Sequence, residues 1–146
     1  MDLIKAGVSP SEIGVVSPYR RQGREIRRYL KRLSGSGSLL RKVVIDTVER
    51  MQGQEREVVL VSLATSDPSF AERLCEFFFQ PNRLNVTITR ARTKLIIVGS
   101  SEVLKAAPND PDMKANVQIF KDFIEYCKYF DISEALEWQE SFLKKS

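Results

Sequence analysis

Three arginines within ten residues are the side chains in this sequence best suited to chemistry on phosphate. Arg83, Arg90 and Arg92 lie in the segment PNRLNVTITRARTKLIIVG, residues 81–99. A guanidinium group is planar, permanently charged and able to bind two oxygens at once, which suits it to phosphoryl groups. The solvated surface of a basic helix would show the same spacing, so these residues alone leave both interpretations open.

The segment around these arginines has the pattern of a helix that leads directly into a strand. Pro81 suits the first turn of a helix, where its missing N–H has no role. The apolar helical stripe consists of Leu84, Ile88 and Ala91. Residues 95–98 are apolar at every position, which predicts a parallel strand covered on both faces. We therefore expect Arg90 and Arg92 where the helix ends and the sheet begins.

The composition predicts one globular domain. The chain has 146 residues, of which 42% are hydrophobic and 29% charged, enough for a single core. The net charge of +4 favours an anionic partner without proving one. No apolar run approaches the ~18 residues of a membrane span, and no signal peptide opens the chain. We therefore expect no membrane partner. We expect the protein to be cytoplasmic, in an intracellular and reducing compartment, or nuclear if the organism is a eukaryote.

Metal chemistry is not expected in this chain. Cys75 and Cys127 lie in apolar helical patterns, which predicts two buried thiols in a reducing compartment, not a disulfide or a metal pair. The sequence has no histidine, the commonest general base and a common zinc ligand. We therefore assign no metal-binding residue.

Apolar strands alternate with helices along the chain. We expect strands at residues 13–16, 43–48, 58–63 and 95–98. Continuous apolar strands separated by helices predict a parallel sheet with helices on both faces, an α/β fold. Ligands of such sheets bind at the carboxyl ends of the strands. The ends to consider are Ser17, Thr47, the residues after Leu63, and Gly99.

The first long helix is strongly basic. Ser17 resembles an N-cap and Pro18 a first helical residue, so we expect this helix over residues 17–33. Its expected buried stripe is Tyr19, Gln22, Ile26, Tyr29, Leu30 and Leu33. Its other faces carry seven cations within residues 20–32, more than solvation requires, although a merely soluble helix is the alternative.

The remaining segments are expected to be turns, short helices and a linker. Gly7 would cap a helix that ends with Leu3 and Ile4, and residues 34–38, SGSGS, have linker chemistry, natural or engineered. Further helices are expected from residue 67, at residues 100–106, at residues 115–130 and after Ser133. One face of the helix from residue 67 would consist of Phe70, Leu74, Phe77 and Phe78.

Three segments in series resemble the motifs of a helicase family. Motif IV of superfamily-one helicases is resembled by residues 13–22, IGVVSPYRRQ. Motif V is resembled by residues 46–55, DTVERMQGQE. Motif VI is resembled by residues 83–92, RLNVTITRAR. Their order and spacing are similar to those in the second RecA-like domain of helicases of the RNA-surveillance and replication-nuclease type. Helicases of this type move 5′ to 3′. The resemblance covers about residues 13–100, some two-thirds of the chain.

This resemblance implies a RecA-like parallel sheet sandwiched by helices, the P-loop NTPase fold, in a domain without its own P-loop. It implies a RecA-like domain at residues 1–106 and a helical extension at residues 107–146 that packs on or flanks it. No G-x-x-x-x-G-K-[ST] phosphate loop occurs. The acidic magnesium motif of the first domain and the arginine-bearing segment before motif IV are absent too. We therefore expect half of a motor, with ATP and Mg²⁺ bound mainly by the first RecA-like domain.

The resemblance also implies roles for single residues. Arg90 is similar to the arginine finger that reaches the γ-phosphate of ATP on the partner domain. The implied nucleotide contacts are Glu55 near the ribose, Gln52 and Gly53 linking nucleotide state to the strand, and Arg92. The implied nucleic-acid contacts are Ser17, Pro18, Tyr19, Thr47, Val48 and Arg83. For Arg83 and Arg92, a role in structural salt bridges is an equally good interpretation. Gln22 could be a buried polar anchor or a ligand contact.

The leading hypothesis is thus the C-terminal motor domain of an ATP-dependent helicase, inactive without its first RecA-like domain and acting on single-stranded DNA or RNA. One alternative is a non-catalytic nucleic-acid-binding module of the same fold. Another is a protein-interaction domain that uses the Phe-rich helix and Trp138. An upstream phosphate loop would favour the motor. The sequence does not distinguish DNA from RNA as the substrate, because a motor that binds the phosphates does not need to contact the bases.

Overall fold

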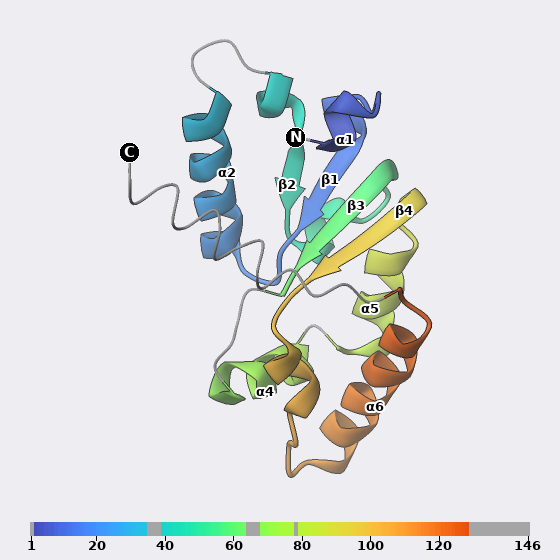
Figure 1. Cartoon of the computed structure of the whole chain (residues 1–146). Coiled ribbons are helices and arrows are strands. Elements are labelled where there is room, and N and C mark those ends of the chain that lie inside the picture. Colours follow the sequence, from blue (N-terminus) through green and yellow to red (C-terminus); the bar gives the residue numbers. More distant parts are fainter. Residues whose placement is uncertain (1, 35–38, 64–67, 78, 129–146) are drawn as a thin grey trace.

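Four parallel strands form one sheet in the order β2-β1-β3-β4 (Figure 1). The computed structural model describes residues 2–34, 39–63, 68–77 and 79–128. The strands are β1 (Ile13–Val16), β2 (Val44–Asp46), β3 (Arg56–Ser62) and β4 (Ala91–Val98). The predicted α/β fold with an all-parallel sheet is confirmed.

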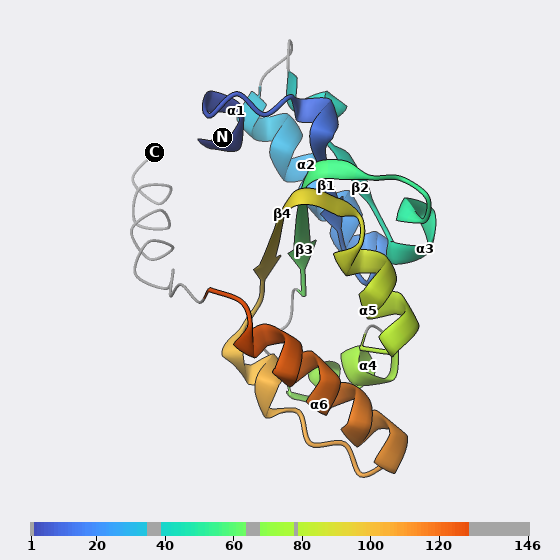
Figure 2. The ribbon, with the colours of Figure 1, turned by 90° about the vertical axis from the view of Figure 1, so that its right-hand side faces the viewer.

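Helices lie on both faces of the sheet and beyond its carboxyl end. α2 (Arg20–Ser34) packs against β2 on one face, whereas α3 (Val48–Met51) and α5 (Pro81–Ile88) lie on the other (Figures 1 and 2). α4 (Pro68–Phe77) and α6 (Pro111–Glu125) pack together beyond the strands. The short elements are α1 (Asp2–Lys5) and the 3₁₀ turns η1 (Pro10–Glu12), η3 (Leu39–Lys42) and η4 (Ser101–Lys105).

The main core lies between the sheet and the helices α3 to α6. Val16, Val59 and Met51 are fully buried in it. The rings of Phe79 and Phe120 stack in parallel, with centroids 4.0 Å apart and an interplanar angle of 11°. Because Phe120 belongs to α6, this stack attaches α6 to the core of the sheet domain.

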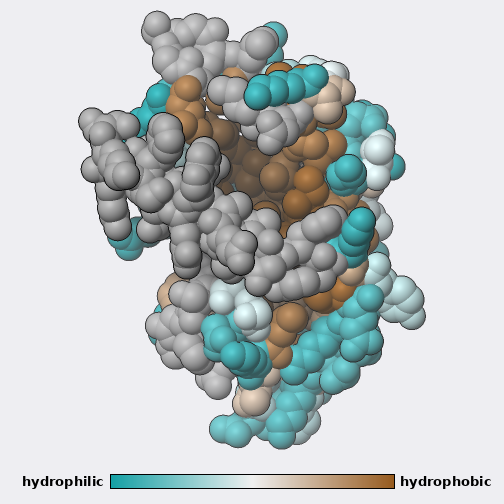
Figure 3. Space-filling view, in the orientation of Figure 1, coloured by the Kyte–Doolittle hydropathy of each residue, from teal (hydrophilic) through white to brown (hydrophobic). Residues whose placement is uncertain are grey.

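The opposite face of the sheet exposes apolar surface. Figure 3 shows hydrophobic residues gathered in a hollow over the strands on the face that carries α2. Val98 at the end of β4 is 42% exposed. The expectation that residues 95–98 form a strand covered on both faces is therefore wrong, because β4 is the edge strand of the sheet.

The start of α2 differs from the sequence prediction. The helix begins at Arg20, and its first hydrogen bond runs from the N–H of Gly23 to the carbonyl of Tyr19 at 3.2 Å. Ser17 is not the N-cap, because its N–H donates to the carbonyl of Asp46 at 3.1 Å and so continues the strand pairing. Its hydroxyl donates to the carbonyl of Tyr19 at 3.1 Å instead of accepting from a helix N–H.

Two later boundaries differ as well. α5 ends at Ile88 and β4 begins at Ala91, so Ala91 belongs to a strand and not to the helical stripe. α6 begins at Pro111 and ends at Glu125, not at residues 115 and 130. Asp110 explains the earlier start, because its carboxylate accepts a hydrogen bond from the N–H of Met113 at 3.0 Å and caps the helix.

Several side chains expected to be buried are exposed. Tyr29 and Leu33 are 50% and 51% exposed, because α2 packs at the β2 edge of the sheet, where its apolar stripe has little sheet beneath it. Phe70 is 37% exposed and packs edge-on against Tyr19. Cys75 is buried as predicted, but Cys127 is exposed because it follows the end of α6.

The start of the chain agrees with the prediction. Gly7 has a φ of +93°, its N–H donates to the carbonyl of Ile4, and the N–H of Val8 donates to that of Leu3, both at 3.0 Å. Residues 35–38, Phe78 and the helix expected after Ser133 lie outside the described residues, as does the side chain of Phe77. No helix in the described ranges is both long and apolar enough to cross a membrane.

Candidate functional site

Polar residues gather at two opposite edges of the sheet. Ser17 and Thr47 directly follow β1 and β2 at the carboxyl edge. Glu55 and Arg90 directly precede β3 and β4 at the amino edge. The seven residues of β3 separate these edges by roughly 20 Å, at about 3.3 Å for each residue. Most predicted nucleic-acid contacts and all predicted nucleotide contacts therefore occupy different ends of the strands.

A groove of about 190 Å³ opens at the carboxyl edge, and we call it the carboxyl-edge groove. It is lined by Ser17, Arg20, Gly23, Arg24, Arg27, Asp46, Thr47 and Arg50. Four of these side chains are cationic and one is anionic, so the lining has an excess of positive charge. Such a lining is suited to the phosphate backbone of a nucleic acid.

Gly23 lets α2 approach the end of β1. A Cβ at this position would lie 3.2 Å from Oγ of Ser17 and 3.6 Å from Cγ2 of Ile45. Ser17 is fully buried, and both its N–H and its hydroxyl donate to backbone carbonyls within the protein. In this structure both donors of Ser17 are therefore already used within the protein. Ser17 stabilises the turn after β1 and offers no free hydrogen-bond donor to a ligand.

Thr47 lies between β2 and α3. Its N–H donates to Oδ1 of Asp46 at 2.9 Å, and its carbonyl accepts from the N–H groups of Arg50 and Met51, each at 3.1 Å. Its hydroxyl makes no capping hydrogen bond to α3, so it remains available to the groove. Val48, the next residue, is buried in the core and packs behind Thr47.

The arginines of the groove differ in their contacts. Arg20 and Arg24 are exposed and have no ion pair or hydrogen bond with any described residue. Arg27 donates to a carbonyl of β2, and Nε of Arg50 lies 3.9 Å from Oδ1 of Asp46. The sequence placed Arg24 in a basic helix but did not assign it or Arg50 to a site. The i, i+4 spacing of Arg20 and Arg24 just after a strand end is the signal that could have found them.

Pro18 and Tyr19 do not line the groove. Pro18 is buried, and the half-buried ring of Tyr19 meets that of Phe70 with centroids 5.4 Å apart and planes at 70°. Burial raises the pKa of the Tyr19 hydroxyl, while the charge of Arg73 lowers this pKa and that of Glu76 raises it. Tyr19 thus connects the start of α2 to α4, while Pro18 is buried and does not face the groove.

Gln22 ties α2 to the end of β3. Its Nε2 donates to the carbonyl of Ser62 at 3.0 Å and to the hydroxyl of Ser62 at 2.6 Å. Its Oε1 is buried without a hydrogen-bond partner among the described residues. In this structure Gln22 acts as an anchor between two elements.

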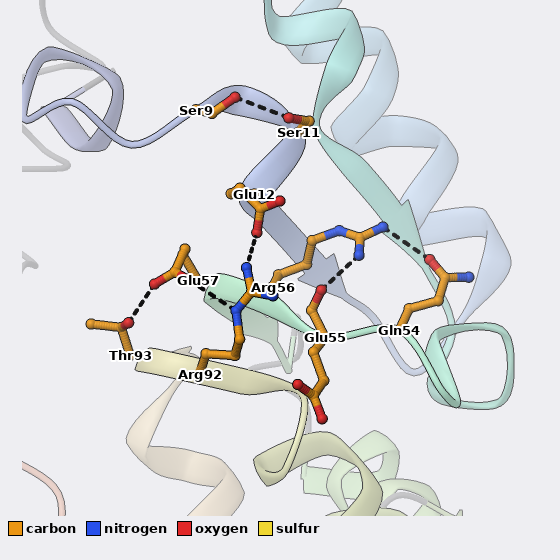
Figure 4. Close-up of polar contacts among 9 residues, drawn as sticks. All are labelled: Ser9, Ser11, Glu12, Gln54, Glu55, Arg56, Glu57, Arg92 and Thr93. Atoms are coloured by element: carbon orange, nitrogen blue, oxygen red, sulfur yellow. Dashed lines mark hydrogen bonds and ion pairs between the residues drawn. The ribbon is translucent and has the colours of Figure 1, made fainter.

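At the amino edge, Arg92 is neutralised by two carboxylates (Figure 4). It pairs with Glu12, and its Nε lies 2.9 Å from Oε1 of Glu57. Glu57 also accepts a hydrogen bond from the hydroxyl of Thr93. This bond, together with the bond and charge of Arg92, holds the pKa of Glu57 below its ordinary value despite opposing desolvation.

A register shift between β3 and β4 explains this cluster. Arg56 pairs with Ala91 but Val58 pairs with Lys94, so β4 has one residue more than β3 between these pairs. Arg92 and Thr93 are consequently both placed against the single residue Glu57. Such bulges redirect side chains next to functional sites.

Arg90 has no carboxylate partner among the described residues. Its Nε donates to the carbonyl of Val86 at 3.0 Å, and its Nη2 donates to the hydroxyl of Thr89 at 3.0 Å. These neutral acceptors at the end of α5 hold the half-buried guanidinium without cancelling its charge. Arg83, in contrast, lies 3.7 Å from Glu49 and joins α5 to α3, away from the carboxyl-edge groove.

The turn at residues 52–55 lies beside Arg90. Gly53 has a φ of +77°, which favours glycine, and a Cβ there would meet nothing within 4 Å. Gln52 and Glu55 are exposed. Arg56, which the sequence did not single out, donates from Nη1 to the carbonyl of Glu55 at 2.7 Å and from Nη2 to Oε1 of Gln54 at 3.1 Å (Figure 4).

The described residues do not fit a bound metal ion. They contain no group of three or more His, Cys, Asp or Glu side chains placed to hold one. They do fit the anionic end of a nucleotide, because the charge of Arg90 is uncompensated at an edge of the sheet.

Comparison with known proteins defines the class to which this fold and these sites belong. The AAA domain family matches residues 1–102, so the chain belongs to that family. It is a superfamily-one helicase-type domain of the RNA-surveillance and replication-nuclease group, with a RecA-like fold. The predicted family is therefore confirmed.

Three relatives illustrate the similarity. The chain is 43% identical over 107 residues to DNA replication ATP-dependent helicase/nuclease DNA2 of Mus musculus, covering 72% of the chain and 9% of the relative. It is 36% identical over 133 residues to Putative helicase MOV-10 of Gallus gallus, covering 83% and 12%. It is 36% identical over 107 residues to Regulator of nonsense transcripts 1 homolog of Arabidopsis thaliana, covering 72% and 8%. The chain thus spans about a tenth of the length of these relatives.

Proposed function

We propose that this chain is the second, C-terminal motor domain of an ATP-dependent helicase that acts on single-stranded nucleic acid. In this proposal Arg90 is the arginine finger, Gln52, Gly53, Glu55 and Arg92 form or support the nucleotide side, and the carboxyl-edge groove binds the strand. The first RecA-like domain would bind the phosphates of ATP and Mg²⁺. The chain alone is therefore inactive.

The observation that carries the proposal is the uncompensated charge of Arg90. The other two arginines of the same motif pair with carboxylates, Arg92 with Glu57 and Arg83 with Glu49. Only neutral oxygens accept hydrogen bonds from the guanidinium of Arg90. A charge kept in this way is free to stabilise negative charge that develops on a transferring phosphoryl group.

The geometry also supports a division of labour between the two edges. At the amino edge, Arg90 would contact the nucleotide when the first domain closes over it. At the carboxyl edge, Arg20, Arg24 and Arg50 would hold backbone phosphates beside the hydroxyl of Thr47. Neither contact requires a base to be read, so the proposal extends to both DNA and RNA.

ATP hydrolysis by the chain and by the intact protein that contains it tests this function. We expect no turnover above background from the purified chain, because the described residues hold no metal site and the sequence has no phosphate loop. We expect turnover in the intact protein that depends on single-stranded nucleic acid. Turnover by the chain alone, lost on Arg90→Ala, would overturn the assignment of a half-motor.

A non-catalytic nucleic-acid-binding module is the second candidate. The observation in its favour is that the carboxyl-edge groove is lined by four arginines and by no residue of the amino edge. Under that alternative, the intact protein would bind single strands without hydrolysing ATP. The same assay therefore separates the two functions.

A further inference from the structure

We infer that the chain has a binding site for an acidic peptide segment of a partner protein, a segment that carries a large apolar side chain between its carboxylates. The site is a pocket of about 360 Å³ between α2, η3 and β2, and we call it the α2–η3 pocket. This volume lies within the range of about 300–1,000 Å³ that is usual for ligand pockets. The inference goes beyond the proposed function, because it concerns a protein partner and requires no nucleotide.

The floor of the α2–η3 pocket is aliphatic. α2 packs against both η3 and β2 at one edge of the sheet (Figure 1). The side chains that form the floor come from all three segments and from the residue that joins η3 to β2: Leu30, Leu40, Val43 and Ile45. Ile45 is 3% exposed and the other three are half-buried. Such a surface gains free energy when an apolar side chain covers it.

The rim of the pocket is cationic. It consists of three exposed side chains, Arg27, Lys31 and Arg41. No acidic side chain of the described ranges lines the pocket. Arg41 has no ion pair or hydrogen bond with any described residue. Positive charge around an apolar floor is complementary to carboxylates on either side of an apolar side chain.

The pocket is suited to side chains and not to an added β-strand. β2 is an edge strand. The carbonyl of Asp46 accepts from the N–H of Ser17 on the β1 side, so the carbonyl of Ile45, one residue earlier, faces the open edge. Arg27 donates to this carbonyl. A peptide strand would have to displace that guanidinium, whereas a side chain can enter the pocket without doing so.

The lining also favours a peptide over a nucleic acid. No aromatic ring of the described residues lines the pocket, so a base would have nothing on which to stack. The carboxyl-edge groove has four arginines and no aliphatic side chain, which suits phosphates alone. The α2–η3 pocket combines three cations with four aliphatic side chains. This combination matches a partner that is both acidic and apolar.

Four substitutions in the chain separate this site from general electrostatic attraction. Arg41→Glu reverses a charge on the rim, and Leu40→Asp places a charge on the floor. Lys42→Glu is the matched control, because Lys42 is exposed and follows Arg41 on η3 but does not line the pocket. Arg20→Glu changes the carboxyl-edge groove and leaves the pocket intact.

The probes are fluorescent peptides in which leucine, isoleucine, phenylalanine or tryptophan stands between pairs of glutamates. Two control sets carry serine in place of the apolar residue or glutamine in place of the glutamates. Fluorescence anisotropy measures Kd, and we expect at least one acidic apolar peptide to bind and its two controls to bind far more weakly. We expect Kd to rise about tenfold in Arg41→Glu and Leu40→Asp, as for residues at the centre of an interface. Kd should change less than about twofold in Lys42→Glu, the size of effect typical of an exposed charge.

Chemical shifts of the backbone amides locate the bound peptide. We expect changes at Leu30, Leu40 and Val43 and none at Thr47 in the carboxyl-edge groove. Thermal melting of each variant shows whether it folds. If Leu40→Asp does not fold, Arg41→Glu decides, because the side chain of Arg41 is exposed.

Three results would each overturn the inference. The first is that no peptide of the set binds, and the second is that Arg41→Glu and Lys42→Glu weaken binding equally. The third is that Arg41→Glu weakens binding of a single-stranded oligonucleotide as much as Arg20→Glu does, which would assign the pocket to nucleic acid. None of these measurements involves ATP, so failure of this inference and failure of the motor assignment are distinguishable.

Discussion

Arg90 and Arg92 lie two residues apart at one edge of the sheet, yet only Arg92 is neutralised by acidic side chains. Arg92 lies between Glu12 and Glu57, whereas Arg90 donates only to the carbonyl of Val86 and the hydroxyl of Thr89. The two cations are therefore not equivalent, although they occupy the same short motif. This difference makes Arg90, and not Arg92, the candidate for contact with a nucleotide.

Replacement of Arg90 in the intact protein tests this directly. We expect Arg90→Ala to reduce ATP turnover by ~10³–10⁵, the typical effect of removing an arginine finger. Nucleotide affinity should fall far less, because such a residue acts mainly on the transition state. Arg90→Lys should also fail, since an ammonium group lacks the planar fork. Steady-state hydrolysis and nucleotide binding are the measurements.

Stability provides the control for this experiment. Arg90 is half-buried and lies outside the main core, so its removal should change the free energy of unfolding by ~1 kcal/mol or less. A variant that retains more than about a tenth of wild-type turnover would show that Arg90 is not the finger, since fingers contribute ~10³-fold or more. Arg83 or Arg92 would then be the next residue to test.

Binding of a single strand to the chain should be weak and sensitive to salt. Neutralised phosphates release counterions, so log Kd should change linearly with log salt, with a slope of about 0.7 for each contact. We expect Arg24→Ala to weaken binding and reduce this slope by about 0.7, because one phosphate contact is lost. Fluorescence anisotropy with a labelled oligonucleotide measures both quantities.

Arg28→Ala is the matched control for Arg24→Ala. Arg28 lies on the same helix but outside the carboxyl-edge groove, and it is paired with Glu25 at 3.1 Å. Its removal should leave the slope unchanged. Equal effects of the two substitutions would mean that the strand follows the whole basic helix and not the groove.

The hydrogen bond of Glu57 with Thr93 and its ion pair with Arg92 should make part of the stability depend on pH. The folded state holds the pKa of Glu57 below its ordinary value of 4.5, so the unfolded chain takes up the proton first as the pH falls. The stabilising contribution is complete above pH 4.5 and is lost as the pH drops through the lower folded value. Urea unfolding of wild type and Glu57→Gln should therefore differ at pH 7, and this difference should shrink as the pH falls below 4.5. A difference that persists unchanged at low pH would contradict this origin.

Substitution of Phe120 tests whether α6 is part of the sheet domain. Phe120 is 1% exposed and stacks on Phe79, so Phe120→Ala should lower the free energy of unfolding by ~3–5 kcal/mol. The neighbouring Ile119 is 42% exposed, and Ile119→Ala should cost much less. One cooperative urea transition, shifted by Phe120→Ala, is expected. A separate, early transition for α6 would instead support an independent extension beyond residue 106.

Local sequence patterns predicted much of the fold. Short apolar runs marked β1 and β3, and Gly7 marked the end of α1, because chain reversal there needs a positive φ. The predicted boundaries of helices and strands were wrong where a tertiary contact outweighs a local sequence preference. The N–H of Ser17 pairs with β2 and delays the start of α2, a contact that spacing along one segment does not reveal.

By itself, the sequence determined the family, the parallel α/β class and the residues of the three motifs, because these depend on residue types and their local order. Only the tertiary structure decided how the charges are balanced. Glu12 and Glu57 are 80 and 35 residues from Arg92 in the chain, and β-strand pairing brings them together around it. Arg90, two residues earlier, lies before the first residue of β4, and its guanidinium donates only to neutral oxygens, so its charge is kept. Coulomb interactions act over a few ångströms in space, so separation along the chain does not predict which arginine remains available.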